Sequence, residues 1–312
     1  MKRAIRFTCC ACILFLLVWA GTAWAHGFAG KRFFPATLVI DDPFVADELS
    51  LPTVSHIKNA DGAKETDFEF EFSKVIFPNF GLSVNETLIR LIPKEDIPRL
   101  GFGNLEVGGK YQFFKSDPHE TILSLGLDAE IGGTGRKAVG ADSFTTFTPA
   151  LFYGKGFGDL PGSLDFLKPF AVTGVLGVAL PTRSKNVIVT DDEEEIERNP
   201  HVLQWGFAVE YSIPYLQSFV KDVGLPAPFN RMIPVVELSF QTPLDRGQGG
   251  KTTGTVNPGI LWTGQFVQLG VEAIIPINNR TGKNVGVIGQ LHFYLDDLLP
   301  KIFGRPLFGG GS

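Results

Sequence analysis

The chain has 312 residues, of which 44% are hydrophobic and 20% are charged, and its formal net charge is −5 at pH 7. A mean hydropathy of +0.13 is high for a water-soluble protein and low for a bundle of membrane-spanning helices. The acidic balance argues against nucleic acid as a partner.

The first 25 residues have the pattern of a secretory signal peptide. Lys2 and Arg3 precede an apolar run over residues 11–19, and residues 23–25 (AWA) form a cleavage motif. A membrane anchor is the alternative, but the apolar run is short for a span. All three cysteines lie between residues 9 and 12, so the mature chain, expected to begin at His26, has no thiol or disulfide chemistry.

Apolar and polar residues alternate through most of the remaining chain, which is typical of β-strands with two different faces. In residues 65–75 (ETDFEFEFSKV), three phenylalanines alternate with three carboxylates. The apolar faces are rich in Leu, Val and Phe, whereas the opposite faces carry Gly, Ser, Gln and acids. Such segments run for about ten residues, the length of a tilted strand that crosses a bilayer.

Loop lengths give an independent indication of topology. The long connections, Gly-rich or charged, are 132–143, 182–200 and 243–252. The shorter ones between them are 115–120, 157–165 and 263–265. Outer-membrane barrels place their long loops outside, and this parity requires a rising strand before residues 65–75. The predicted strands are then 48–57, 65–75, 80–91, 104–114, 121–131, 144–156, 168–181, 202–213, 233–242, 253–263, 266–276 and 285–295.

The sequence therefore predicts an all-β fold, a closed antiparallel transmembrane β-barrel of about 12 strands with a short N-terminal plug-like segment. Residues 1–25 would be the signal peptide, and 26–47 a periplasmic or luminal segment. Residues 48–295 would form the barrel in the Gram-negative outer membrane, followed by a periplasmic tail at 296–312. Within the barrel range, residues 214–232 predict a short amphipathic helix on the periplasmic side.

Three segments resemble one family of bacterial outer-membrane proteins. They are 101–114 (GFGNLEVGGKYQFF), 179–182 (ALPT) and 258–278 (PGILWTGQFVQLGVEAIIPIN), and the family is grouped as the MetA-pathway of phenol degradation. The resemblance covers most of residues 65–295 and implies a channel-like barrel, sometimes encoded near genes for aromatic degradation. The chain has Asn104 where the family usually has Asp, and Arg183 where a Gly is usual. The family has no established catalytic residues to carry over.

If the apolar faces meet lipid, nine acids point into the lumen against one clear inward base, Lys110. These acids are Asp67, Glu69, Glu71, Glu106, Asp128, Glu130, Glu210, Glu237 and Glu272. Rings of acidic side chains favour cations in a pore. The alternative is that bound ions, or plug contacts from Lys31 and Arg32, neutralise them. Twelve strands make a narrow barrel compared with the porins of 16 to 18 strands, so the pattern does not by itself predict an open pore.

Two groups of possible metal ligands carry little signal. The run Asp191–Glu195, with Glu197, has no EF-hand spacing and is interpreted as a solvated extracellular loop. A mature N-terminal His26 can chelate copper, but the other histidines show no ligand spacing; they are His56, His119, His201 and His292. We therefore expect neither a metal nor a cofactor.

An enzymatic function would require a nucleophile close to a base. The candidates are Ser239, on an inward face, and His292, on the last strand. No G-x-S-x-G, H-E-x-x-H or phosphate-loop motif occurs, so we expect no enzyme. The main hypothesis is a barrel among outer-membrane lipids that passively passes or binds small, hydrophobic or aromatic solutes. The rivals are a plugged structural or surface barrel, an outer-membrane lipid hydrolase and, at the level of fold, a soluble periplasmic β-protein. The oligomeric state stays open.

Overall fold

The computed structural model describes residues 27–189 and 194–309 of the protein. Within them, twelve strands form the wall of one barrel: β3 (Glu48–Lys58), β4 (Lys64–Phe77), β5 (Phe80–Ile92), β7 (Glu106–Ser116), β8 (Thr121–Glu130), β9 (Thr146–Gly156), β10 (Phe170–Pro181), β13 (Val202–Tyr211), β14 (Met232–Pro243), β15 (Thr253–Thr263), β16 (Val267–Pro276) and β17 (Gly286–Tyr294). Every pairing between them is antiparallel, and β17 pairs with β3 to close the ring. The predicted all-β fold and closed barrel of 12 strands are confirmed.

Two features of the strands differ from the prediction. A short strand, β6 (Arg99–Phe102), pairs with the later half of β5, while β7 pairs with its earlier half. β6 and β7 together therefore occupy one place in the wall, interrupted at residues 103–105. In addition, β11 (Lys185–Val189) and β12 (Glu194–Arg198) form a separate hairpin inside the connection 182–200, for which the sequence predicts only a loop.

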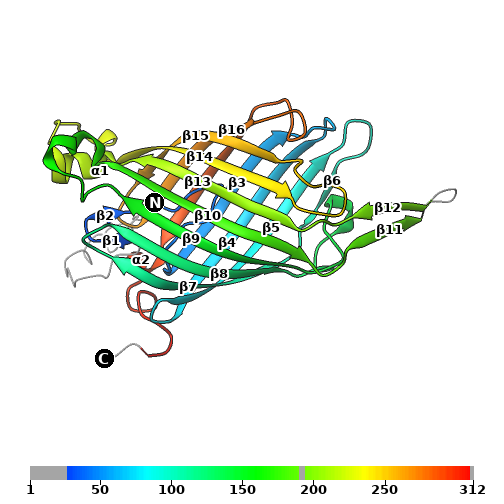
Figure 1. Cartoon of the computed structure of the whole chain (residues 1–312), viewed down its shortest axis with the longest axis horizontal. Helices are drawn as coiled ribbons and strands as arrows, with labels where there is room; N and C mark the ends of the chain where they lie inside the picture. Colours follow the sequence, from blue (N-terminus) through cyan, green and yellow to red (C-terminus); the bar gives the residue numbers. More distant parts are fainter. Residues whose placement is uncertain (1–26, 190–193, 310–312) are drawn as a thin grey trace, which may run out of the picture.

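The barrel has two distinct ends, which we call the plug end and the loop end (Figure 1). The plug end carries β1 (Phe28–Ala29), β2 (Arg32–Phe33), α1 (Ile213–Tyr215), η3 (Leu216–Val220) and α2 (Leu295–Leu298). The loop end carries β6 and the β11–β12 hairpin. Three short 3₁₀ turns complete the described elements: η1 (Lys137–Val139), η2 (Gly162–Leu167) and η4 (Phe229–Arg231).

The helix predicted over residues 214–232 is formed only in part. α1 continues into the π-helical η3, which ends at Val220, and the next residue, Lys221, has an extended conformation with φ −156°. The segment beyond contains Pro226 and Pro228, which lack the amide hydrogen that a continuing helix needs. No helix within residues 27–189 and 194–309 is both long and apolar enough to span a membrane.

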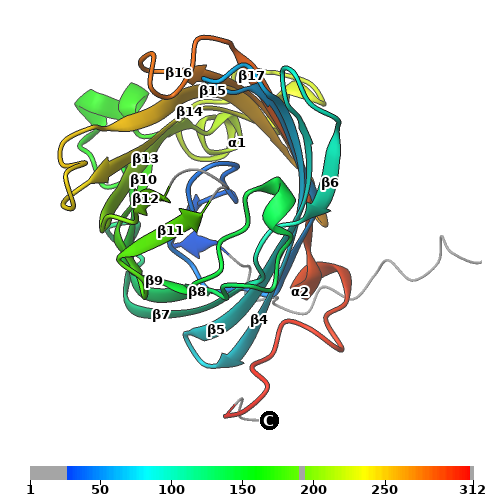
Figure 2. The ribbon, with the colours of Figure 1, turned by 90° about the vertical axis from the view of Figure 1, so that its right-hand side faces the viewer.

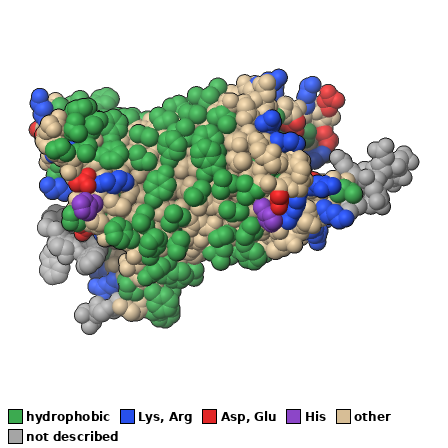
Figure 3. Space-filling view, in the orientation of Figure 1, with side chains coloured by type: hydrophobic (Ala, Val, Ile, Leu, Met, Phe, Trp, Pro, Cys, Tyr) green, Lys and Arg blue, Asp and Glu red, His purple; other side chains and the backbone are tan. Residues whose placement is uncertain are grey.

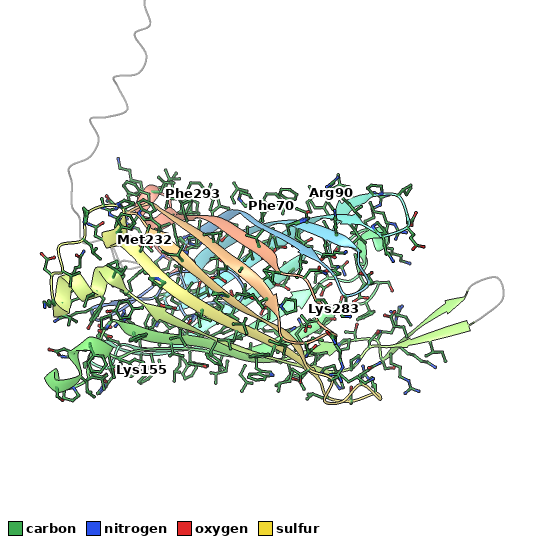
Figure 4. The ribbon with its side chains drawn as sticks, turned by 90° about the horizontal axis from the view of Figure 1, so that it is seen from above. Phe70, Arg90, Lys155, Met232, Lys283 and Phe293 are labelled. Carbon is green, nitrogen blue, oxygen red and sulfur yellow. The ribbon has the colours of Figure 1, made fainter. Side chains whose placement is uncertain are left out.

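On the face drawn in Figure 3, apolar side chains spread over the wall of the barrel, and the charged side chains gather toward its two ends. Large side chains on the wall strands are about half exposed, including Leu82, Tyr111, Leu125, Leu176 and Val271. Phe70 lies between the ends of the barrel, whereas Arg90 and Lys283 lie toward the loop end and Lys155 toward the plug end (Figure 4). Soluble monomers rarely expose apolar patches of this extent, and lipid-facing barrels have such a band.

The core of the protein lies between this wall and residues 27–47, which we call the plug segment. Figure 2 shows the plug segment inside the ring of strands. Leu38 and Ile40 pack against inward-facing wall residues; these include Ala208, Ile233, Val235, Leu261 and Ile288. A second cluster joins Ala29, Phe34 and Phe44 of the plug segment to Ile122 and Ala171 of the wall. The plug segment is therefore part of the hydrophobic core.

Candidate functional site: a plugged lumen with an acidic wall

Glu237 of β14 holds the middle of the plug segment. Its two carboxylate oxygens accept hydrogen bonds from the backbone N–H groups of Leu38, Val39 and Ile40, at 2.6, 3.0 and 2.8 Å. Residues 38–40 form bends with no strand partner, so these donors depend on the carboxylate. Because Glu237 is fully buried, water does not compete for the three bonds.

Lys110, the inward base of β7, holds the next part of the plug segment. Its ammonium donates to the backbone oxygen of Asp42 at 2.8 Å and lies 3.5 Å from the Asp41 carboxylate and 3.6 Å from that of Asp42. The same ammonium stands 4.6 Å from the ring centroid of Phe152. Burial raises the pKa of the Asp42 carboxyl to about 8, although the Lys110 ammonium opposes this shift.

Arg32 anchors the plug segment to the turns at the plug end. Its Nε lies 3.2 Å from the Glu120 carboxylate, and its Nη1 donates to the backbone oxygen of Pro169 at 3.0 Å. The guanidinium carbon stands 3.9 Å above the centre of the Tyr215 ring, whose hydroxyl donates to Glu120 at 2.8 Å. Burial, followed by the bond to Glu120, raises the pKa of Tyr215 to about 12. Arg32 and Glu120 are both buried. Removing either side chain would therefore leave the other as an unpaired buried charge.

Asp47, at the end of the plug segment, joins three parts of the chain. Its carboxylate accepts bonds from the Lys74 ammonium at 2.7 Å and the Val75 backbone N–H at 2.6 Å, both in β4. It also accepts a bond from the Gly304 N–H at 2.7 Å, in the tail that follows α2. The tail continues alongside β4, where Phe303 contacts Phe72 at a centroid distance of 6.1 Å. One buried carboxylate thus connects plug segment, wall and tail.

The nine predicted lumen acids fall into two groups in the structure. Six lie half-buried on β4, β7 and β8, strands of one side of the ring in which β5 separates β4 from β7. We call them the acidic wall: Asp67, Glu69, Glu71, Glu106, Asp128 and Glu130. The other three, Glu210, Glu237 and Glu272, are buried on β13, β14 and β16, the side of the ring against which Leu38 and Ile40 pack. The plug segment therefore covers one side of the lumen more fully than the other.

Members of the acidic wall bind mostly to neighbouring wall side chains. Glu69 accepts a bond from the Asn85 amide at 2.6 Å, and Asp67 accepts one from the Ser55 hydroxyl at 3.2 Å. A cavity of about 60 Å³ separates this wall from the plug segment, with Glu71, Asp128 and Lys110 in its lining. A space of that size holds only a few water molecules.

The predicted plug contacts have different partners from those expected. Arg32 pairs with Glu120, which is not among the nine lumen acids, because it lies at the plug end rather than in the lumen. The Lys31 ammonium lies 5.2 Å from the ring centroid of Phe219 in η3, outside the lumen. Inside the lumen, two wall residues hold the plug segment instead. Lys110 pairs with Asp41, and the Glu237 carboxylate accepts hydrogen bonds from plug backbone amides such as that of Ile40.

Sequence reasoning missed Glu120, Asp47 and the pair Asp41–Asp42. The Asp41–Asp42 pair had a detectable signal, because two plug acids and a single inward base are complementary in charge. Glu120 had none: it lies in a four-residue turn with φ 45°, and the turn alone does not indicate an arginine partner.

The serine–histidine pair considered from the sequence does not form. Ser239 is on β14 and His292 on β17, and β15 and β16 lie between them. His292 instead accepts or donates a 2.9 Å bond with Ser50 through Nδ1, and its Nε2 lies 3.5 Å from Glu48. All three side chains are buried and border the small cavity beside the plug segment.

Asn104 explains one departure from the resembled family. It lies in the interruption between β6 and β7, and its amide nitrogen donates to Glu130 at 2.9 Å and to the Asp142 backbone oxygen at 3.0 Å. Its amide oxygen accepts the Gly135 N–H at 3.0 Å. An aspartate accepts but cannot donate, so only the amide supports all three contacts. They hold the loop 131–145, which lies within the outline of the barrel at the loop end (Figure 2).

No group of three or more His, Cys, Asp or Glu side chains suited to a metal ion occurs in the described part of the chain. The acidic run Asp191–Glu195 and His26 lie largely or wholly outside the described residues, as does the predicted signal peptide. Glu197 is exposed on β12 and pairs in register with Asn186.

No protein-family model and no curated protein matches the chain. Among solved structures, the COG4313 outer membrane channel from Pseudomonas putida F1 is similar with a TM-score of 0.58 at 11% identity, covering 84% of this chain and 99% of that one. A structure titled KdgM porin gives a TM-score of 0.44 at 11% identity, covering 78% of this chain and 97% of that one. LpxR from Salmonella typhimurium gives 0.41 at 11% identity, covering 79% and 99%.

At these identities the likeness concerns fold alone. The resemblance to the MetA-pathway family stays a prediction, because no family model supports its name. The kind of fold that this resemblance implied is confirmed: the chain is a closed 12-stranded barrel of the type found in outer-membrane proteins.

Proposed function

We propose that the protein is a barrel of the Gram-negative outer membrane that passes or binds small solutes through an acidic lumen controlled by the plug segment. The observation that carries the proposal is the uneven filling of the lumen. Leu38 and Ile40 of the plug segment pack against the side formed by β13 to β17. Six half-buried carboxyl groups, and a cavity with room for a few waters, lie on the side of β4, β7 and β8. Such an arrangement leaves a polar route along the acidic wall.

Membrane location is supported by the outer surface. Its exposed leucine, valine and aromatic side chains form a band between charged ends, as lipid-facing barrels require. The signal peptide read from residues 1–25 supplies the export route in this proposal. Because outer-membrane barrels place their long loops outside, the loop end faces the exterior and the plug end faces the periplasm in this proposal.

The charge of the lumen supports a preference for cations. Six carboxyl groups face the route, and Lys110 is the base among them that holds the plug segment. Fixed negative charge concentrates cations and repels anions in a narrow pore. A preference for hydrophobic or aromatic solutes is supported by the family resemblance and not by the polar lining of the route.

Passage in this proposal requires the plug segment to shift. The cavity of about 60 Å³ has room for a few waters but not for a larger solute. Lys110 stands where the cavity meets Asp41 and Asp42, so this contact is the gate that must open. The wall itself is held by a closed ladder of strands and need not change.

The experiment measures single-channel conductance and reversal potential of the purified mature chain in planar bilayers. We expect small cation-selective currents, larger currents for Lys110→Met, and weaker cation selectivity for Glu69→Gln, which leaves the plug contacts intact. Ser239→Ala is the matched control, because Ser239 also faces inward and makes no hydrogen bond with the plug segment in the described structure. A folded protein that stays silent in all four forms would reject transport.

The rival, a sealed structural or surface barrel, predicts silence for the unaltered chain. It also predicts that Lys110→Met stays silent, because the remaining plug contacts would keep the lumen closed. Anion-selective currents would contradict the role given to the acidic wall while leaving a channel in place.

A further inference from the structure

A second pocket lies outside the lumen, at the plug end. Its volume is about 390 Å³, within the range of roughly 300–1,000 Å³ that small-molecule sites occupy. Four segments form it: the start of the plug segment, α1 with η3, the turn between β15 and β16, and the junction of β17 with α2. The solute route along the acidic wall does not use it.

Five aromatic residues line it: Phe28, Phe33, Tyr215, Phe219 and Tyr294. Phe28 and Phe219 are exposed, whereas Tyr215 and Tyr294 are buried at the edge of the pocket. Phe28 and Phe33 stand 5.1 Å apart between ring centroids, and Phe33 meets Tyr294 edge to face at 6.1 Å. Tyr215 of α1 and Phe219 of η3 also line the pocket, with their ring centroids 5.0 Å apart. Tilted and edge-to-face rings at such distances offer further ring faces and edges to an aromatic guest.

The two tyrosines present their rings, not their hydroxyls, to the pocket. The Tyr215 hydroxyl is bound to Glu120 at 2.8 Å, and its ring is held beneath the Arg32 guanidinium. The Tyr294 hydroxyl is bound to Gln268 at 3.0 Å. Because these bonds fix the rings before any ligand arrives, binding costs little ordering of the wall.

The charges in the pocket are sparse and opposite. Lys31 contributes an ammonium 5.2 Å from the Phe219 ring centroid, and it forms no ion pair within the described residues. Asp297 contributes a carboxyl group, which has interactions of its own. An uncommitted ammonium beside aromatic rings matches a ligand that combines a ring with an anionic group.

We propose that this pocket binds a small aromatic carboxylate, with its ring packed among the five aromatic side chains and its carboxylate paired with Lys31. The site goes beyond the proposed channel function, since binding at the plug end requires no passage through the lumen. Because Phe28, Lys31 and Phe33 belong to the plug segment, the complete site exists only while that end of the segment is docked. A bound ligand therefore stabilises the docked form.

The test titrates benzoate, benzyl alcohol and hexanoate into the full mature chain in lipid nanodiscs, with calorimetry or ligand-detected NMR as the readout. We expect benzoate to bind more tightly than the uncharged alcohol and the aliphatic acid. Lys31→Gln should weaken benzoate on the order of tenfold and leave the alcohol unchanged within about twofold. Asp297→Asn should strengthen benzoate a few-fold, because it removes a like charge.

Two variants complete the design. Phe219→Leu keeps an apolar side chain but removes the aromatic ring, and should weaken benzoate more than hexanoate. Lys221→Gln is the matched control, an exposed lysine just after η3 that does not line the pocket. Both Lys31 and Lys221 are exposed, so neither substitution threatens the fold.

Three results would overturn the proposal. Equal binding of benzoate and hexanoate would identify a site for an alkyl or lipid chain. Equal binding of benzoate and benzyl alcohol, unaffected by Lys31→Gln, would show that Lys31 does not recognise the carboxylate. Absence of benzoate binding to a folded protein would remove the site. None of these results bears on conductance, so the two proposals fail separately.

Discussion

Replacing Glu237 by alanine removes the acceptor of three backbone hydrogen bonds and tests whether the plug segment opens as a unit. The carboxylate accepts N–H groups at 2.6, 2.8 and 3.0 Å inside the barrel. Hydrogen bonds to charged groups contribute about 1.5–3 kcal/mol each. Removing the charge also relieves the neighbouring buried Glu272, and water can enter the space left behind. We therefore expect Glu237→Ala to destabilise the docked plug segment by roughly 3–5 kcal/mol, less than the sum of three bonds.

Residues 26–312 contain no cysteine, so a single introduced cysteine can be labelled without competition from other thiols in that part of the chain. A cysteine introduced as Ala36→Cys lies in the plug segment, where the alanine is 4% exposed. Its reaction with a maleimide then depends on how often the segment opens. A loss of 3–5 kcal/mol raises the labelling rate by roughly 2 to 3.5 powers of ten, since about 1.4 kcal/mol corresponds to a factor of ten.

Ser239→Ala is the matched control here as well, because it alters the same inward face of β14 two residues away. Heat-modifiable mobility on gels shows whether the barrel itself is folded. If Glu237→Ala stays folded and its labelling rate remains within about threefold of the unaltered chain, then the three bonds do not hold the plug segment, and the reasoning is wrong.

Three further predictions concern the other plug contacts. Arg32→Ala leaves the buried Glu120 carboxylate unpaired and should lower stability by about 3–5 kcal/mol in urea unfolding, whereas exposed Lys221→Ala should change it little; equal effects would contradict the anchor. Because the pKa of Asp42 rises from 3.8 to about 8 on docking, the docked form binds the proton more tightly. Docking should therefore weaken as pH rises from about 4 to about 8, and Asp42→Asn should flatten the pH dependence of Ala36→Cys labelling. We expect the contact between Ser50 and His292 to be structural, so a fluorophosphonate probe should not label the protein. Labelling that Ser50→Ala abolishes would instead support the lipid hydrolase hypothesis.

Much of the wall could be predicted because apolar and polar residues alternate along a strand that faces lipid on one side and a polar lumen on the other. The rest of the chain lacks this alternation. The stretch 65–75 shows this: Phe72 is 38% exposed on the outside, while Glu69 and Glu71 face inward. Loop parity then predicted the direction of each strand.

Local irregularities were not predictable from alternation. A bulge between Gln112 and Phe114 leaves both Phe113 and Phe114 exposed, whereas strict alternation would turn one of them inward. The break at residues 103–105 depends on Asn104 binding a loop about 30 residues later, a contact that no local pattern encodes.

The candidate site was the least predictable part. The plug segment binds Glu237 through backbone amides, which every non-proline residue has, so its sequence gives no sign of the partner. Sequence reasoning placed the acids on inward faces but could not say which of them would be covered. That depends on the side of the ring that Leu38 and Ile40 occupy, a choice made by packing rather than by charge.

The three-way contact at Asp47 has a consequence for how the protein is assembled. Its donors come from β4 and from Gly304, which follows the last wall strand in the chain. The acceptor belongs to the earliest part of the folded chain, and the last donor to one of the latest. The complete set of bonds therefore requires the tail to have turned back along β4. The carboxylate that ends the plug segment thus links the first and the last described parts of the chain, and all three of its bonds form only once the sequence of the last wall strand has been synthesised.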